Sequence, residues 1–117
     1  MRRDEVLEQC GSLPGAIEDY PFGEDVAVFK VGGRIFALVP LGADPATMSL
    51  KCDPALALEL RARHPAIRPG YHLNKRHWNT IALDGSVDAD ELRELIDHSY
   101  QLVVAGLTRA VRDTLPR

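Results

Sequence analysis

The chain has few cysteines and no long apolar run, and these absences narrow the classes of protein to which it can belong. Two cysteines among 117 residues are too few for the disulfide framework of a small secreted domain, so we expect Cys10 and Cys52 to be reduced and buried. No apolar stretch approaches the ~20 residues that a membrane-spanning helix needs. The N-terminus becomes acidic within its first few residues and lacks the apolar core of a signal peptide. We therefore expect a cytoplasmic protein that does not enter a membrane.

Motifs for catalysis, cofactors and metals are also missing. No serine lies in a nucleophile-elbow context, and no glycine-rich loop precedes a helix as a phosphate-binding cradle requires. The sequence contains neither Cys-x-x-Cys nor His-Glu-x-x-His, which are spacings typical of zinc ligands. We therefore expect no enzyme activity, no cofactor and no metal.

Length and composition favour a single globular domain. With 45% hydrophobic and 26% charged residues among 117, the chain is long enough for one core without support from metals or disulfides. No internal repeat, linker or low-complexity segment divides it. We expect residues 1–117 to form one domain, and we expect that domain to be a monomer.

Alternating and β-branched apolar residues predict three strands in the first half of the chain. Residues 26–31 and 34–39 are separated by a Gly-Gly pair, which suits the positive φ angles of a primed hairpin turn. In residues 47–52 every second side chain is apolar, so one face of this strand is expected to be buried and the other, which carries Ser49, to be wet. Residues 16–25 mix turn formers with two aromatics and predict a packed loop.

Helical periodicity and a second pair of strands complete the order of the elements. Helices are expected over residues 3–12, 54–63, 89–105 and 108–115. The second of these begins after an Asp-Pro pair, a strong start signal, and is expected to point Arg61 and Arg63 outward. Residues 67–73 and 78–83 predict a second hairpin or a close equivalent. The order α-β-β-β-α-β-β-α, with a short helical tail, predicts an α+β two-layer sandwich in which a five-stranded, mostly antiparallel sheet has helices on one face.

Charge is unevenly distributed, and one stretch stands out because it contains no acid. The net charge of −3 argues against a protein that coats nucleic acid by bulk electrostatics. Residues 61–77, however, carry five Lys and Arg and no Asp or Glu, between flanks in which acids outnumber bases. The overlapping stretch 70–80 holds the only Trp and two of the four His. A basic surface with amides and aromatics is typical of nucleic-acid binding, so we place the candidate site at about residues 61–80.

Eight side chains in this region are candidate nucleic-acid contacts: Arg61, Arg68, His72, Asn74, Lys75, Arg76, His77 and Trp78. The cations can contact phosphates, Asn74 can bond a backbone or a base edge, and Trp78 or Tyr71 can stack on an unpaired base. Structural alternatives exist for each of them. Trp78 at a strand start can be a core residue, the two histidines can be structural hydrogen-bonding groups, and Asn74 can bond its own chain in a turn. The remaining cations can simply be solvated at the tip of a turn. The sequence leaves all these alternatives open.

Five segments of the chain match, in order, the pattern of a known protein family. They are PFG at 21–23, VFKVGG at 28–33, LKCDP at 50–54, PGYHLNKRHWNT at 69–80 and LIDHSY at 95–100. Together they resemble the bacterial MmcQ/YjbR family over nearly the whole chain. The resemblance implies a compact α+β fold related to the frataxin-like (CyaY-like) and secretion-chaperone-like sandwiches. It also implies a DNA-binding role. The family is given this role because of its shape, in which two hairpins are arranged like a double wing.

The resemblance implies no catalytic residues, since the family has none agreed. The positions that match its main motif are Tyr71, His72, Asn74, Lys75, His77, Trp78 and Asn79. Two functional hypotheses follow. The first is a non-catalytic DNA-binding protein that contacts nucleic acid through the basic hairpin region at about residues 61–80. The alternative is a small protein-interaction or chaperone-like module that holds a partner protein on an exposed sheet face or edge.

Overall fold

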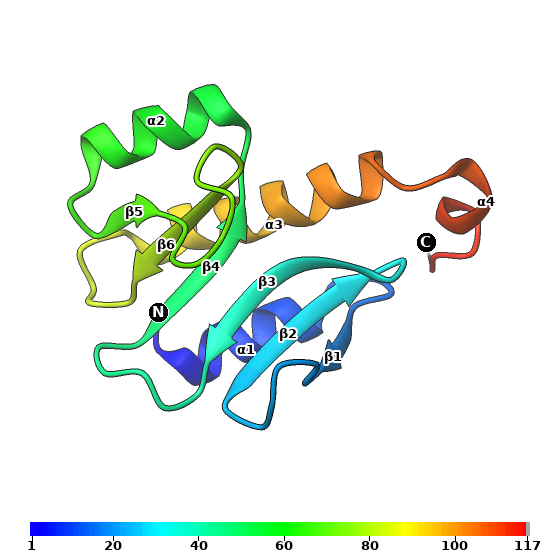
Figure 1. The fold of residues 1–117 in the computed structure, drawn as a ribbon, viewed down its shortest axis with the longest axis horizontal. Coiled ribbons are helices and arrows are strands. Elements are labelled where there is room, and N and C mark those ends of the chain that lie inside the picture. Colours follow the sequence, from blue (N-terminus) through cyan, green and yellow to red (C-terminus); the bar gives the residue numbers. More distant parts are fainter. Residues whose placement is uncertain (117) are drawn as a thin grey trace.

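A computed structural model describes residues 1–116 as six strands and four helices (Figure 1). The strands are β1 (Ile17–Asp19), β2 (Val26–Val31), β3 (Arg34–Pro40), β4 (Thr47–Lys51), β5 (Ile67–Pro69) and β6 (Trp78–Ala82). The helices are α1 (Arg3–Gly11), α2 (Pro54–Arg63), α3 (Ala89–Ala105) and α4 (Arg109–Arg112). Within this part of the chain, no helix has the length and apolar character needed to cross a membrane. Arg117, the last residue of the expected domain, lies outside the described residues.

All six strands join one antiparallel sheet in the order β1-β2-β3-β4-β6-β5. The expected α+β class and antiparallel sheet are confirmed, and so are the pairings of β2 with β3 and of β5 with β6. Gly32 and Gly33 turn the first hairpin with φ angles of 58° and 81°, as a primed turn requires. β5 is shorter than expected and ends at Pro69, because Pro has no N–H for the strand ladder and Gly70 begins a loop.

The sequence predicts five strands, and the sixth is β1, which lies inside the segment expected to be a packed loop. All three of its residues are exposed, so no alternation of apolar and polar side chains marks it as a strand. It is held by main-chain pairing with β2 and by an ion pair of 2.9 Å between Asp19 and Lys30. β1 is therefore an edge strand held by backbone hydrogen bonds and one ion pair, neither of which leaves a hydrophobic pattern in the sequence.

One buried core lies between the sheet and the three longer helices. Val6 of α1, Leu60 of α2 and Ile96 of α3 belong to the same buried cluster as Met48 of β4 and Ile81 of β6. In Figure 1, α1 and α3 lie behind the sheet, and α2 lies beside β5 and β6. The helices thus cover one face of the sheet, as the order of the elements predicts, and the other face is open.

The two cysteines are free and buried, as expected from their number and their apolar surroundings. Burial raises the pKa of the Cys10 thiol to about 12. Burial also raises the pKa of Cys52 to about 11, with a further increase from the charge of Asp53 and a smaller opposing effect from Arg61. Both groups are thiols rather than thiolates at neutral pH, so neither is a ready nucleophile.

The open face carries a row of side chains that crosses the whole sheet. From β1 to β5 the row is Asp19, Val28, Leu38, Ser49, Thr80 and Arg68, each paired with the next across neighbouring strands. These side chains point away from the core because successive residues of a strand face opposite sides. The sequence predicts a wet Ser49, but it is only 8% exposed. Its hydroxyl and that of Thr80 form a hydrogen bond of 2.8 Å between the two strands.

Ser99, in the middle of α3, fixes the helix against two strands. Its Oγ donates a hydrogen bond of 2.6 Å to the carbonyl of Phe36 in β3 and accepts one of 2.9 Å from the N–H of Lys51 in β4. The side chain is fully buried, so these contacts replace water for three polar groups. Ser99 therefore sets the position of α3 along the sheet.

We predict that Ser99→Ala lowers the free energy of unfolding by about 1–3 kcal/mol, because a buried N–H and a buried carbonyl lose their partner. Urea denaturation followed by circular dichroism measures the change. Ser12→Ala is the matched control, since the exposed Ser12 hydroxyl bonds only the carbonyl of Gln9, and its effect should stay within about 0.5 kcal/mol. Equal effects of the two substitutions would contradict the role given to Ser99.

Candidate nucleic-acid interface

The candidate residues gather around residues 70–77, which connect β5 to β6 and are called the β5–β6 loop below. The loop leaves the sheet at Gly70, whose N–H donates to the carbonyl of Trp78 at 2.8 Å. A Cβ at Gly70 would lie 2.8 Å from the Cβ of Trp78, so only glycine fits this close approach. The next N–H, that of Tyr71, donates to Thr80 Oγ1 at 2.9 Å. His72 follows with a left-handed φ of 57°, which helps the chain to turn away from the sheet.

Asn74 bonds its own chain, which is one of the alternatives that the sequence leaves open. Its Oδ1 accepts hydrogen bonds from the N–H groups of Arg76 (3.0 Å) and His77 (3.2 Å). Its main-chain carbonyl accepts from the N–H of Trp78 at 3.0 Å. The side-chain oxygen of Asn74 therefore shapes the turn. His77 serves a similar structural purpose, since its carbonyl accepts from the N–H of Cys52 at 2.8 Å and joins the loop to the end of β4.

Arg61 anchors the β5–β6 loop from α2, contrary to the expectation that it points outward. Its Nε donates to Oδ1 of Asn79 at 2.7 Å. Its Nη2 donates to the carbonyls of Trp78, at 3.3 Å, and of Lys75. The reason lies in helical spacing: Arg61 is four residues after Ala57, a core residue, so it borders the buried side of α2. Asn79 is 2% exposed, and the guanidinium supplies the partner that its buried oxygen needs.

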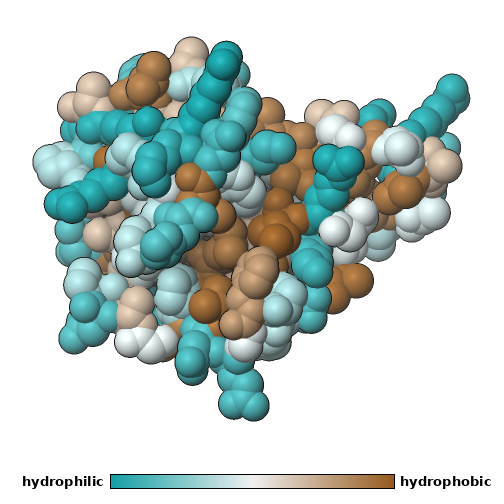
Figure 2. Space-filling model, viewed as in Figure 1, coloured by the Kyte–Doolittle hydropathy of each residue, from teal (hydrophilic) through white to brown (hydrophobic). Residues whose placement is uncertain are grey.

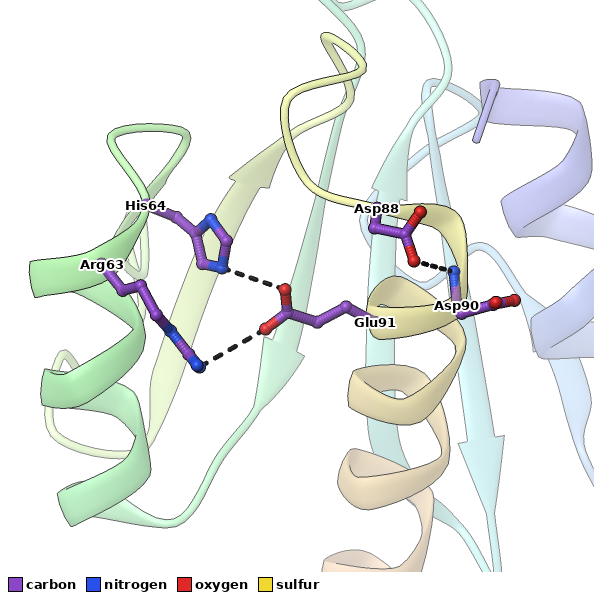
Figure 3. Close-up of polar contacts among 5 residues, drawn as sticks. All are labelled: Arg63, His64, Asp88, Asp90 and Glu91. Carbon is purple, nitrogen blue, oxygen red and sulfur yellow. Dashed lines mark hydrogen bonds and ion pairs between the residues drawn. The ribbon is translucent and has the colours of Figure 1, made fainter.

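Arg63 does not add to the basic surface, because an acid from another helix pairs with it. Figure 3 shows Glu91, in the first turn of α3, reaching between Arg63 and His64 at the end of α2. Arg63 Nη2 lies 3.4 Å from one carboxylate oxygen, and His64 Nε2 lies 3.0 Å from the other. Glu91 follows Arg63 by 28 residues, so nothing in the local sequence indicates this pairing.

Three exposed cations remain near the loop: Arg68 on β5, and Lys75 and Arg76 within the loop itself. Among residues 1–116, none of the three forms an ion pair with an acid. Lys75 Nζ donates to the carbonyl of Gly70 at 2.9 Å. Arg68 is paired across the strands with Thr80, the residue that also bonds the N–H of Tyr71. Lys75 and Arg76 thus lie in the loop, Arg61 reaches it from the side of α2, and Arg68 lies just before it on the open face of the sheet, whereas Arg63 is outside the group.

Two aromatic residues frame this basic surface. Tyr71 is 72% exposed, and its ring centroid lies 4.0 Å from that of His72. Trp78 alternates with Asn79, which faces the core, so the indole lies on the open face of the sheet, where it is half-buried. Trp78 is not part of the buried core cluster. Tyr71, which is absent from the eight candidate contacts although it belongs to the family motif, is the more accessible ring; the available signal was its place directly after Pro69-Gly70, a pair typical of turns.

The described residues of this region form no cluster of metal-binding side chains. Among residues 1–116, no three His, Cys, Asp or Glu side chains lie close enough together to hold a metal ion. The chemistry available at the β5–β6 loop is therefore that of guanidinium, ammonium and aromatic groups. Such groups suit the binding of anions and planar rings.

Comparison with protein-family models matches residues 11–102 to the YjbR family. The chain is 37% identical over 115 residues to "Uncharacterized protein YjbR" of Escherichia coli K12, and the match covers 98% of both chains. It is 38% identical over 116 residues to "Uncharacterized protein YyaQ" of Bacillus subtilis, covering 87% of this chain and 98% of the relative. These matches confirm the family to which the five sequence segments point.

Two solved structures share the fold. Protein DR2400 of Deinococcus radiodurans, whose crystal structure contains a DUF419 domain, superimposes with a TM-score of 0.88 at 46% identity, covering 94% of this chain and 84% of that one. A crystal structure of a protein from Pseudomonas syringae gives a TM-score of 0.77 at 31% identity, covering 88% of this chain and 99% of that one. The α+β sandwich is therefore shared with experimentally determined relatives.

We predict that Arg61→Ala lowers the free energy of unfolding by about 2–3 kcal/mol, because it removes charge-assisted hydrogen bonds and leaves the buried Asn79 oxygen without a partner. Urea denaturation measures this loss. Arg76→Ala removes the same charge from an exposed position in the loop and should change stability by less than about 0.5 kcal/mol. If Arg61→Ala were as mild as the control, Arg61 would not be the anchor of the loop.

Proposed function

The chain belongs to the YjbR family, and we propose that it binds DNA without catalysing a reaction, through the basic surface around the β5–β6 loop. The observation that supports the proposal is a set of exposed cations with no ion pair to an acid among residues 1–116: Lys75 and Arg76 in the loop and Arg68 on the adjoining strand β5, with Arg61 bound to the loop from the side of α2. Lysine and arginine are the usual partners of DNA phosphates. The curated relatives described above carry only the name uncharacterised, so the proposal rests on the chemistry of the loop.

The cations and the aromatic ring have different roles in the proposed binding, because they are held differently by the structure. The exposed Arg68, Lys75 and Arg76 contact phosphates. Arg61 mainly keeps the loop in place and adds its positive charge from the side of α2. Tyr71, 72% exposed, offers a face on which an unpaired base can stack. A single-stranded or locally opened segment uses both the cations and this ring, so we expect it to bind more tightly than a closed duplex.

The sheet separates the basic surface from an acidic one. β1, which carries Glu18 and Asp19, lies at one edge of the sheet, and β5, which carries Arg68, lies at the other. Five strand spacings separate the two edges, or about 24 Å, which exceeds the Debye length of about 8–10 Å at physiological salt. Glu18 and Asp19 therefore lie beyond the range of strong repulsion from an anion bound at the β5 edge, although the protein has a net charge of −3.

We predict a measurable but limited salt dependence of DNA binding. Three or four phosphate contacts give a slope of log K against log salt of about −2 to −3 for the single strand and about −3 to −4 for the duplex. Fluorescence anisotropy with a labelled 20-nucleotide single strand and its duplex, between 50 and 200 mM salt, measures this slope. Lys75→Glu combined with Arg76→Glu should weaken binding roughly tenfold or more, since two attractions become repulsions.

A control with the same change of net charge separates local contact from bulk electrostatics. Arg34→Glu combined with Arg109→Glu alters two exposed arginines on the β2–β3 hairpin and α4, far from the β5–β6 loop in Figure 1. Binding should then change by less than about threefold. A flat salt response, or equal effects of the two double variants, would refute the DNA-binding proposal and favour the protein-interaction alternative.

A further inference from the structure

The open face of the sheet contains a second candidate site, distinct from the phosphate contacts. A hollow of about 890 Å³ lies beside the β5–β6 loop, and none of the residues that line it belongs to a helix. This volume falls within the range of about 300–1,000 Å³ that is usual for small-molecule pockets. Figure 2 shows this face of the sheet with apolar surface at its centre; the hollow itself is lined by prolines, alanines and polar residues on the side of β5 and β6.

The walls of the hollow are apolar and stiff. Four prolines line it, Pro40, Pro45, Pro65 and Pro69, together with the exposed ring of Tyr71. Proline has no N–H to satisfy and a fixed φ, so these walls bring little polar surface and little freedom to lose on binding. The floor is formed by β6 residues that stand on the open face, such as Thr80 and Ala82. The hollow is thus largely preformed and suits an apolar body.

Arg68 gives the hollow a charged group that a ligand can pair with. It is exposed and lines the hollow, and its side chain forms no ion pair with an acid within residues 1–116. A guanidinium presents parallel N–H donors that match a carboxylate in bidentate fashion. Charge complementarity therefore favours an anionic group of the ligand at Arg68.

The other charged group of the hollow, Asp84, excludes an anion from the opposite end. Its Oδ1 accepts hydrogen bonds from Ser86 Oγ (2.6 Å) and from the Ser86 N–H (2.9 Å), and these bonds hold the pKa of Asp84 below its usual value. Asp84 comes four residues after Thr80, the partner of Arg68, so it is on the order of 13 Å away along an extended chain. Only one end of the hollow thus attracts a carboxylate.

We infer that this hollow binds a small, mainly apolar molecule with a single carboxylate, its charged end on Arg68 and its apolar part against the prolines and Ala82. The inference is independent of DNA binding, since the apolar walls and the size of the hollow carry it and only Arg68 and Tyr71 are common to both surfaces.

Decanoate and decylammonium, used below their micelle concentrations, form a matched pair of probes with equal chain length and opposite charge. A titration followed by ¹H–¹⁵N NMR should show saturable shifts for decanoate at the amides of Arg68, Tyr71, Thr80 and Ala82. Decylammonium cannot pair with the guanidinium, and the one acid that lines the hollow, Asp84, is exposed and already bonded to Ser86, so decylammonium should bind at least tenfold more weakly. Equal or tighter binding of decylammonium, or decanoate shifts confined to α1 and α3, would overturn the inference.

Two substitutions test the same contacts from the protein side. Arg68→Gln should weaken decanoate binding roughly tenfold, and Ala82→Leu, which fills part of the hollow, should weaken both probes. Unchanged decanoate affinity in Arg68→Gln would refute the assignment of the carboxylate to Arg68. The double variant Lys75→Glu with Arg76→Glu should still bind decanoate, so failure of DNA binding and failure of this inference are distinguishable.

Discussion

The basic surface depends on the hydrogen bonds that the half-buried guanidinium of Arg61 donates. Placed between α2 and the β5–β6 loop, it satisfies the side-chain oxygen of Asn79 and main-chain carbonyls of Lys75 and Trp78. Taking such a group partly out of water is costly unless its donors are used. Here the bonds that offset this cost also define the shape of the loop. The half-buried Arg61 therefore holds the loop that carries the exposed Lys75 and Arg76.

Much of the fold could be predicted from the sequence because burial leaves a periodic pattern. The Gly-Gly hairpin, the helix after Asp53-Pro54 and the long helix α3 all agree with expectation. β1 could not be predicted in this way, since its residues are all exposed and its partners are backbone groups of β2. The burial of Ser49 could not be predicted for a different reason, since a hydroxyl bonded to Thr80 across the sheet is buried without being apolar.

The candidate site was only partly predictable. An acid-free stretch can be read directly from the chain, and two of its five cations lie in the loop, with Arg61 bound to it and Arg68 on the adjoining strand. Tertiary contacts decide the rest: Glu91 of α3 pairs with Arg63, and Asn79 draws Arg61 inward. The hollow beside the loop has no sequence signature at all, because its prolines come from β3, β5 and two connections that are distant in the chain and adjacent only after folding.

Placing DNA on the protein residue by residue tests the central claim most directly. In ¹H–¹⁵N NMR spectra recorded with a short single-stranded DNA, the largest shift changes should lie at residues 68–77, and the amides of β1 at the far edge of the sheet should remain unchanged. Changes centred on β1 or on the outer surface of α3, or no changes at low salt, would contradict a nucleic-acid interface at the β5–β6 loop.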